Sequence, residues 1–211
     1  MTSVLLCSAL TASYVALGRF VVTHPLLGID RAGRSFAGEF PRLAYVFTAS
    51  CFFPVLLGFG LALIVLAIVS RAWRTRAIFS VVLMLVSWRV SDFAKDAFLR
   101  PRPHYWVLRH ETSYSYSSGH AMFAVIVYGL WACLIATSDL PRAVRAFGAT
   151  LLGLWACGII WSRLALGAHY VTDLVGGVLL GLAMILFSAG VARAVFRADE
   201  NRFRHVAAPL K

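Results

Sequence analysis

The chain has 211 residues and a formal net charge of +11, yet only 14% of its residues are charged and 60% are hydrophobic. Soluble proteins carry roughly 25% charged residues, so this composition excludes an ordinary soluble domain. Apolar runs of about 20 residues, long enough to cross a bilayer, recur along the whole chain. The sequence therefore predicts a single all-α integral membrane domain over residues 1–211, without internal repeats.

Six apolar segments are predicted to form membrane-spanning helices. They lie at about residues 3–22, 51–70, 77–94, 120–137, 146–162 and 174–196. The second segment has no charged residue, whereas Arg89 and Asp92 interrupt the third. The first is preceded only by Met-Thr-Ser, without the basic start of a cleavable signal peptide. We therefore expect it to be retained as a span.

Positive charges gather on one side of this six-span arrangement. They follow the second, fourth and sixth spans, at Arg71, Arg74, Arg76, Arg142, Arg145, Arg193, Arg197, Arg202, Arg204 and Lys211. The positive-inside rule assigns that side to the cytoplasm, where such charges also meet anionic lipid headgroups. The pattern argues against nucleic-acid binding. It predicts cytoplasmic termini and outward-facing loops at 23–50, 95–119 and 163–173.

The four cysteines are scattered through the apolar segments, at Cys7, Cys51, Cys133 and Cys157. Their spacing matches no metal-ligand pattern. We expect small buried hydrophobic side chains rather than a disulfide or a zinc site.

The third span ends in charged residues. On a helix, Arg89, Asp92 and Asp96 lie close to one face, and ionisable groups at membrane depth are usually paired, so we interpret Arg89 and Asp92 as a structural ion pair. Lys95 emerges at the outer interface, and the prolines around Arg102 stiffen the segment that could aim this arginine back toward it. Either cation taken alone would more often be an interface anchor than a ligand. Peripheral headgroup contacts are expected for the flanking residues Arg100, His104, Arg109 and His110.

The next polar stretch, Ser117-Ser118-Gly119-His120, stands immediately before a clean apolar span. A Ser-Gly turn that enters a helix is typical of an N-cap, and it leaves backbone N–H groups free to bind an anion. Ser118 could donate its hydroxyl to the same anion, and His120 could protonate a leaving oxygen. The alternative is a simple helix cap with an interfacial histidine, and this stretch alone favours neither.

The third stretch joins the fifth and sixth spans. Ser162-Arg163 ends one, and His169 and Asp173 precede the other at a four-residue spacing that places them on one helical face. A carboxylate there can hold one imidazole N–H and leave the other nitrogen free to attack, although structural His–Asp pairs are also common. Glycines at 176, 177 and 181 predict close helix packing. Together, the three stretches supply the charge, nucleophile and proton donor that phosphoryl transfer requires.

These residues resemble the three signatures of the type 2 phosphatidic-acid phosphatase superfamily. The matching patterns are K-x(6)-R-P from Lys95 to Pro103, S-G-H from Ser118 to His120, and S-R-x(5)-H-x(3)-D from Ser162 to Asp173. The family usually has proline before Ser-Gly-His, where this chain has Ser117. That difference removes a rigid φ angle and no catalytic group.

The resemblance implies metal-independent dephosphorylation through a phosphohistidine, with no cofactor. His169 would be the nucleophile, Asp173 would orient it, and His120 would protonate the departing lipid oxygen. The phosphate would be held by Lys95, Arg102, Ser118, Gly119 and Arg163. Soluble relatives of this family, such as vanadium-dependent haloperoxidases, do not fit the apolar spans.

An outward site beside lipid predicts an amphiphilic substrate in a bacterial inner membrane. We expect undecaprenyl diphosphate, because its recycling requires an outward-facing site, with phosphatidylglycerophosphate or lipid A as alternatives. A lipid phosphotransferase would share the same covalent intermediate, and a non-catalytic lipid-binding or transport protein could use the same bundle. The loop 23–50, which contains Pro25, Gly28 and Phe36, is a candidate lid over the site.

Overall fold

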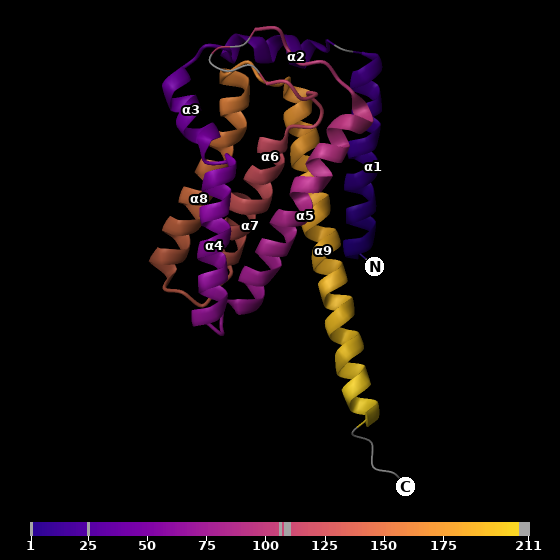
Figure 1. Cartoon of the computed structure of the whole chain (residues 1–211), viewed down its shortest axis with the longest axis vertical. Coiled ribbons are helices and arrows are strands. Elements are labelled where there is room, and N and C mark those ends of the chain that lie inside the picture. Colours follow the sequence, from indigo (N-terminus) through magenta and orange to yellow (C-terminus); the bar gives the residue numbers. More distant parts are fainter. Residues whose placement is uncertain (1, 25, 106, 108–110, 207–211) are drawn as a thin grey trace.

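The computed structural model describes residues 2–24, 26–105, 107 and 111–206, without the side chains of Thr2 and of residues 195–206. This part of the chain is helical and contains no strand, as predicted (Figure 1). The elements are α1 (Thr2–Thr23), α2 (Gly28–Gly33), the 3-10 helix η1 (Arg34–Phe36), α3 (Pro41–Ala49), α4 (Phe53–Val69), α5 (Arg74–Phe98), α6 (Gly119–Phe123), the π-helical turn η2 (Ala124–Gly129), α7 (Leu130–Ala136), α8 (Arg142–Ala165) and α9 (Val171–Val206).

Five helical segments are long and apolar enough to cross a membrane, and a bent pair raises the number to six. The five are Ser3–Thr23, Arg74–Phe98, Gly119–Ala136, Arg142–Ala165 and Val171–Ala194. The bent pair is α3 and α4, which meet at 42°. Because α4 has 17 residues, it is about 25 Å long at the usual helical rise, short of a hydrocarbon core of about 30 Å. The charge-free helix α4 is therefore too short on its own and reaches spanning length only together with α3.

The segment 23–50, predicted as a loop, is largely helical. It holds α2, η1 and α3, and α2 lies across one end of the bundle (Figure 1). Gly28 begins α2 and Phe36 ends η1, whereas Pro25 lies outside the described residues. The lid function of this segment stays a prediction.

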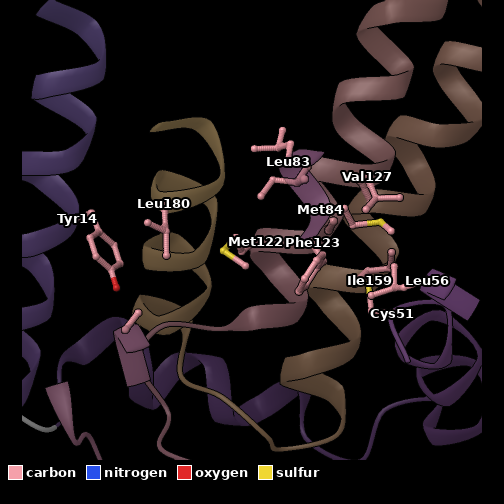
Figure 2. Packing of buried hydrophobic residues seen from close by; sticks show 14 of the residues in the cluster. Tyr14, Cys51, Leu56, Leu83, Met84, Met122, Phe123, Val127, Ile159 and Leu180 are labelled. Carbon is pink, nitrogen blue, oxygen red and sulfur yellow. The ribbon is translucent and has the colours of Figure 1, made fainter. Parts of the chain in front are cut away.

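The core surrounds the segment formed by α6, η2 and α7, which carries His120 in its first turn. Met122 of this segment is fully buried in a hydrophobic cluster to which four other helices contribute, with Tyr14, Leu83, Ile159 and Leu180 (Figure 2). Because side chains from α1, α5, α8 and α9 meet here, the position of His120 is set by the packing of the whole bundle.

Glycines of α9 bring that helix against α6, which confirms the predicted close packing. A Cβ atom on Gly177 would overlap the carbonyl oxygen of Ser118, and one on Gly176 would overlap the ring of Tyr116. On Gly181 a Cβ atom would lie 3.0 Å from Cβ of Val125. Small residues at these positions allow the start of α9, with Asp173, to lie beside the start of α6.

The two ends of the bundle differ in what their connections carry. The α4–α5 and α7–α8 turns, with their arginines, lie at the end toward which α9 extends, whereas the α5–α6 and α8–α9 connections lie at the opposite end with α2 (Figure 1). All three motif stretches are therefore at one end.

Two expectations about side chains are wrong. Arg89 and Asp92 are both exposed on α5, and no ion pair among the described residues joins them. Both point away from the bundle, so a buried pair is not needed to satisfy their charges. Of the cysteines, Cys51 is buried and Cys7 is partly buried, whereas Cys133 and Cys157 are exposed on the outer faces of α7 and α8. All four are free thiols.

Candidate active site

Lys95 and Arg102 converge on Ser113, a residue that the motifs do not include. Lys95 Nζ donates to Ser113 Oγ at 3.3 Å, and Arg102 Nη2 donates to the same oxygen at 2.9 Å. Arg102 Nε also donates to the Ser113 carbonyl at 2.6 Å. Lys95 lies in the last turn of α5 and Arg102 in the connection that follows. The two cations thus lie together, as the proline-stiffened segment predicts.

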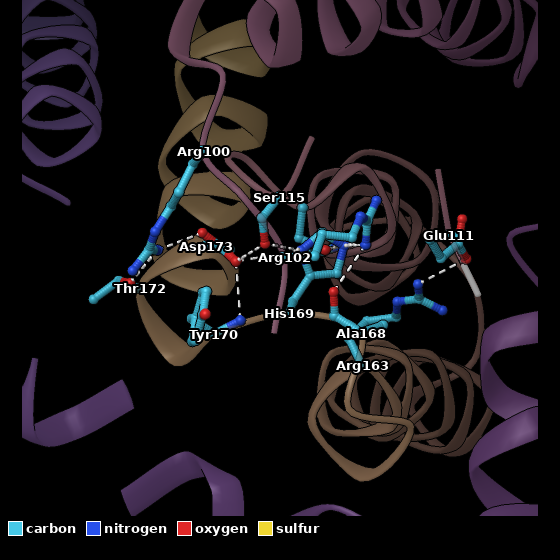
Figure 3. A network of polar contacts seen from close by, with 12 residues as sticks. Arg100, Arg102, Glu111, Ser115, Arg163, Ala168, His169, Tyr170, Thr172 and Asp173 are labelled. Atoms are coloured by element: carbon cyan, nitrogen blue, oxygen red, sulfur yellow. Dashed lines mark hydrogen bonds and ion pairs between the residues drawn. The ribbon is translucent and has the colours of Figure 1, made fainter. Parts of the chain in front are cut away.

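Arg102 also reaches His169. Its Nη1 atom lies 3.0 Å from Nε2 of His169 and donates to the Ala168 carbonyl at 2.8 Å (Figure 3). A guanidinium can only donate, so Nε2 accepts here and the ring proton resides on Nδ1. The contact selects the tautomer whose Nε2 lone pair is available to a phosphorus atom.

Asp173 occupies the other side of the imidazole. Its Oδ2 atom lies 3.4 Å from Nδ1 of His169 and accepts from the Tyr170 N–H at 2.9 Å. Ser115 donates a short hydrogen bond to the same oxygen and lies 3.4 Å from Nδ1 (Figure 3). His169 is 2% exposed and Asp173 is fully buried. The prediction that both residues lie on one helical face is wrong, because α9 begins at Val171, after His169. Carboxylate and ring nevertheless meet in a dry environment.

Ser118 caps α6, which confirms the predicted N-cap. Its Oγ accepts from the Ala121 N–H at 3.4 Å, and its own N–H donates to the Asp173 carbonyl at 3.1 Å. Gly119 begins the helix, and a Cβ atom there would lie 2.8 Å from the Ser91 hydroxyl. In the following turn, Nε2 of His120 is buried without a hydrogen-bond partner among the described residues. A buried donor or acceptor of this kind is ready for a group that is not part of the protein.

Arg163 completes the ring of cations. It lies in the last turn of α8, where its Nη1 donates to the Thr48 hydroxyl at 2.5 Å. Its Nη2 forms an ion pair with Glu111 at 3.1 Å (Figure 3). Arg163 is 2% exposed, whereas the side chain of Glu111 is 24% exposed. Because Glu111 reaches solvent, water can hydrate its carboxylate when the carboxylate leaves Arg163.

Arg100 corrects the expectation of a peripheral headgroup contact. It is 1% exposed and forms ion pairs with Asp173 at 2.5 Å and with Asp30 at 2.9 Å. Leu99 ends α5 with a positive φ of 52°, and this turn directs Arg100 into the protein. His104 is exposed, and its headgroup role stays a prediction. Two further residues given that role, Arg109 and His110, lie outside the described residues.

Burial is the main influence on ionisation around the imidazole. It lowers the pKa of His169 well below its usual value, and the positive charges of Arg102, Arg163 and Lys95 lower it further. His169 is therefore neutral at physiological pH. Burial also lowers the pKa of Arg102 to about 10, which still leaves the guanidinium charged at neutral pH.

The structure thus brings together all eight predicted site residues, at the ends of α5, α6, α8 and α9. It adds residues that no motif predicted, which are Asp30, Thr48, Glu111, Ser113, Ser115 and Thr172. All six lie in the three outward segments predicted as loops, where a lone polar residue gives no pairing signal. Among the described residues, no group of three or more His, Cys, Asp or Glu side chains has a metal-binding arrangement.

Two known proteins are similar to part of this chain. Phosphatidylglycerophosphatase B of Bacillus subtilis is 34% identical over 105 residues, or 49% of this chain and 51% of the relative. The Escherichia coli protein of the same name is 35% identical over 97 residues, or 44% of this chain and 36% of the relative. The match therefore spans about half of the first relative and about a third of the second.

The fold is also that of a solved structure, described as the first transmembrane PAP2 type phosphatidylglycerolphosphate phosphatase from Bacillus subtilis. The TM-score is 0.76 at 23% identity, over 90% of this chain and 96% of the other. The sequence matches the PAP2 superfamily profile over residues 75–197, more than half of the chain and a region that contains all three motifs. The chain therefore belongs to the PAP2 superfamily.

Proposed function

We propose that the chain is a membrane lipid phosphatase, which removes a terminal phosphate through a phosphohistidine formed on His169. The observation that carries the proposal is the pair of contacts at the imidazole, with Asp173 on the Nδ1 side and Arg102 at 3.0 Å from Nε2. A neutral ring held in this tautomer among three cations can attack a phosphate whose negative charge the cations offset.

In the first step, the Nε2 lone pair of His169 forms a bond to phosphorus and the bond from phosphorus to the lipid oxygen breaks. His120, in its protonated form, supplies the proton to that oxygen from Nε2, which is buried without a hydrogen-bond partner among the described residues. The phosphorylated ring keeps its proton on Nδ1 and becomes cationic. Asp173 stabilises that positive charge from Oδ2.

In the second step, water attacks phosphorus, and the bond from phosphorus to nitrogen breaks. His120 accepts the proton of the water, so it returns to its first protonation state as inorganic phosphate forms. Lys95, Arg102 and Arg163 hold the phosphate oxygens in both steps, together with Ser118 and the Gly119 N–H. A loose phosphoryl-transfer transition state needs chiefly this positioning and charge stabilisation.

The names of the matched relatives favour phosphatidylglycerophosphate as the substrate. Undecaprenyl diphosphate, expected from the outward-facing site, stays an alternative, as does lipid A. In each case the phosphate reaches the motif-bearing end of the bundle while the lipid tail remains in the bilayer. The separation of arginines and motifs between the two ends supports a bacterial inner-membrane protein with cytoplasmic termini and a periplasmic site.

The test is phosphate release by the purified full chain in EDTA from phosphatidylglycerophosphate, undecaprenyl diphosphate and lipid A. We expect release from phosphatidylglycerophosphate that is lost in His169→Ala and kept in the matched control His24→Ala, whose ring is exposed at the end of α1. Undiminished release by His169→Ala would contradict the mechanism. Release from undecaprenyl diphosphate instead would change the substrate and keep the chemistry.

A lipid phosphotransferase is distinguished in the same assay. Radiolabelled phosphatidylglycerophosphate is mixed with an unlabelled lipid acceptor. Label that appears in inorganic phosphate supports the hydrolase, and label that appears in the acceptor supports the transferase. Specific binding of the lipids without release or transfer would instead favour a lipid-binding or transport protein.

A further inference from the structure

Arg100 lies between two buried carboxylates. Its Nη1 contacts Oδ1 of Asp173 at 2.5 Å (Figure 3). Its Nη2 contacts Oδ2 of Asp30 at 2.9 Å. Asp30 and Arg100 are each 1% exposed, and Asp173 is fully buried. The PAP2 motifs quoted above include Asp173 alone, and the chemistry proposed above uses neither Asp30 nor Arg100.

Thr172 closes the cluster. Its hydroxyl donates to Asp30 at 2.9 Å and accepts from Nη1 of Arg100 at 2.7 Å. Its backbone N–H donates to Oδ1 of Asp30 at 3.0 Å. Asp30 comes from α2, and this contact fastens α2 to the first turn of α9. The planar guanidinium thus bridges two elements that are far apart in sequence, and its geometry suits such a fork.

The cluster fixes which oxygen of Asp173 faces the imidazole. Arg100 holds Oδ1, so Oδ2 is left for Ser115, the Tyr170 N–H and Nδ1 of His169. A free carboxylate could rotate and exchange its two oxygens. With Oδ1 held in an ion pair at 2.5 Å, rotation would break a buried ion pair, which is strongly unfavourable.

The charges of the cluster explain why two carboxylates are present. Arg100 alone would neutralise Asp173, and the pair would then offer no net charge to the cationic phosphohistidine. With Asp30 included, the cluster retains one net negative charge. We propose that Asp30 and Arg100 are positioning residues, in which Arg100 orients Asp173 and Asp30 preserves the negative charge that stabilises phosphorylated His169. This inference rests on the proposed phosphohistidine mechanism.

The alternative is a clamp that only holds α2, α5 and α9 together. The two roles predict different effects on the pKa of His169 when a charge of the cluster is removed. For a positioning role the direction of the shift depends on the sign of the removed charge, whereas for a purely mechanical clamp it does not. Groups of both signs already face this imidazole: Asp173 on α9, Lys95 on α5, Arg102 after α5, Arg163 on α8 and His120 on α6.

The test compares pH profiles of kcat/KM for two neutralising variants of the full chain. Asp30→Asn removes a negative charge, so the pKa of His169 falls and the acid limb moves to lower pH. Arg100→Gln removes a positive charge, so the limb moves to higher pH. We expect shifts of roughly half a pH unit in opposite directions. The same phosphatidylglycerophosphate serves for both variants, so titration of its own phosphate cancels in the comparison.

The kinetic constants provide a second readout. Asp30→Asn should lower kcat by roughly 10- to 100-fold, as for other residues that support a reactive group from behind, with KM nearly unchanged because Asp30 does not touch the phosphate. Arg100→Lys keeps the charge and loses the fork, so kcat should fall while the acid limb stays in place. The matched control is Asp92→Asn, an exposed carboxylate on α5, which should change neither.

The outcomes separate the two proposals. If His169→Ala retains activity in the same assay, the phosphohistidine mechanism fails first. If His169 is required but the two neutralising variants leave the acid limb unmoved, or move it in one direction, the positioning role is wrong and the cluster is mechanical. If Arg100→Gln does not give monodisperse protein, Asp30→Asn and Arg100→Lys still test the positioning role. We expect the acid limb to move in Asp30→Asn and to stay in place in Arg100→Lys.

Discussion

Two groups of charged residues meet at His169 and differ in how they are held. On one side, Asp30, Arg100 and Asp173 are buried and bind one another in fixed ion pairs. On the other side, Arg163 binds a threonine hydroxyl and a partly exposed Glu111, while Lys95 contacts a serine hydroxyl. The first group is a permanent scaffold. The second, the exchangeable group, consists of Lys95, Arg163 and also Arg102, which binds the same serine hydroxyl as Lys95. A phosphate can replace the present contacts of these cations.

The largest effect should come from breaking the fixed group at Asp173. Asp173→Asn removes the charge that stabilises the phosphorylated ring, and we expect kcat to fall roughly a thousandfold. The control is Asp96→Asn, an exposed carboxylate on the same end of the bundle. Phosphate release by Asp173→Asn within tenfold of the wild type would mean that the scaffold does not act on His169.

Breaking the exchangeable group should cost less, because several cations share the phosphate. Arg163→Gln should lower kcat/KM by about 100-fold, comparable with the loss of one preorganised donor. Arg142→Gln, an exposed arginine at the opposite end, serves as the control. An equal loss in the two variants would point to general charge effects at the membrane rather than phosphate binding.

The sequence predicted the exchangeable group much better than the fixed one. Lys95, Arg102 and Arg163 lie at motif spacings at the ends of apolar segments, where periodicity and the positive-inside rule place them on one side. Arg100 could not be assigned in this way. Its direction depends on the positive φ of Leu99, and its partner Asp30 lies in a different outward segment of the chain.

The fold, like the site, could be predicted from the sequence only in part. Six apolar segments predicted the helical bundle, because burial in lipid requires helices whose backbone groups are internally bonded. The 42° break between α3 and α4 and the helices of segment 23–50 had no comparable signal. Hydropathy reports the length of an apolar run, and it does not report where a helix bends.

Glu111 tests whether the contacts of the second group are exchangeable. It forms an ion pair with Arg163 and does not belong to the buried scaffold. Glu111→Gln removes a negative charge that competes with phosphate, so KM should fall several-fold while kcat is unchanged. Steady-state kinetics with Glu39→Gln, an exposed glutamate, provide the control. A rise in KM would show instead that Glu111 holds Arg163 in its working position.

The smallest effect concerns pH. Burial lowers the pKa of His169 below its usual value of about 6.5, so the reactive neutral ring persists as the pH falls through that value. Between pH 7.5 and 6.5, kcat should therefore change less than about twofold. An acid limb centred above pH 6.5 would indicate that the ring is more solvated, or that the scaffold imposes more negative charge, than the structure indicates.

The most direct test of the account is to trap the covalent intermediate. Radiolabelled phosphatidylglycerophosphate is mixed with the full chain, the reaction is quenched by denaturation in alkali, and protein-bound label is measured. We predict label that is stable in alkali and lost in acid, as expected for phosphohistidine, present in the wild type and in His24→Ala and absent from His169→Ala. Acid-stable label, or equal label in His169→Ala, would contradict the central claim that His169 is the nucleophile.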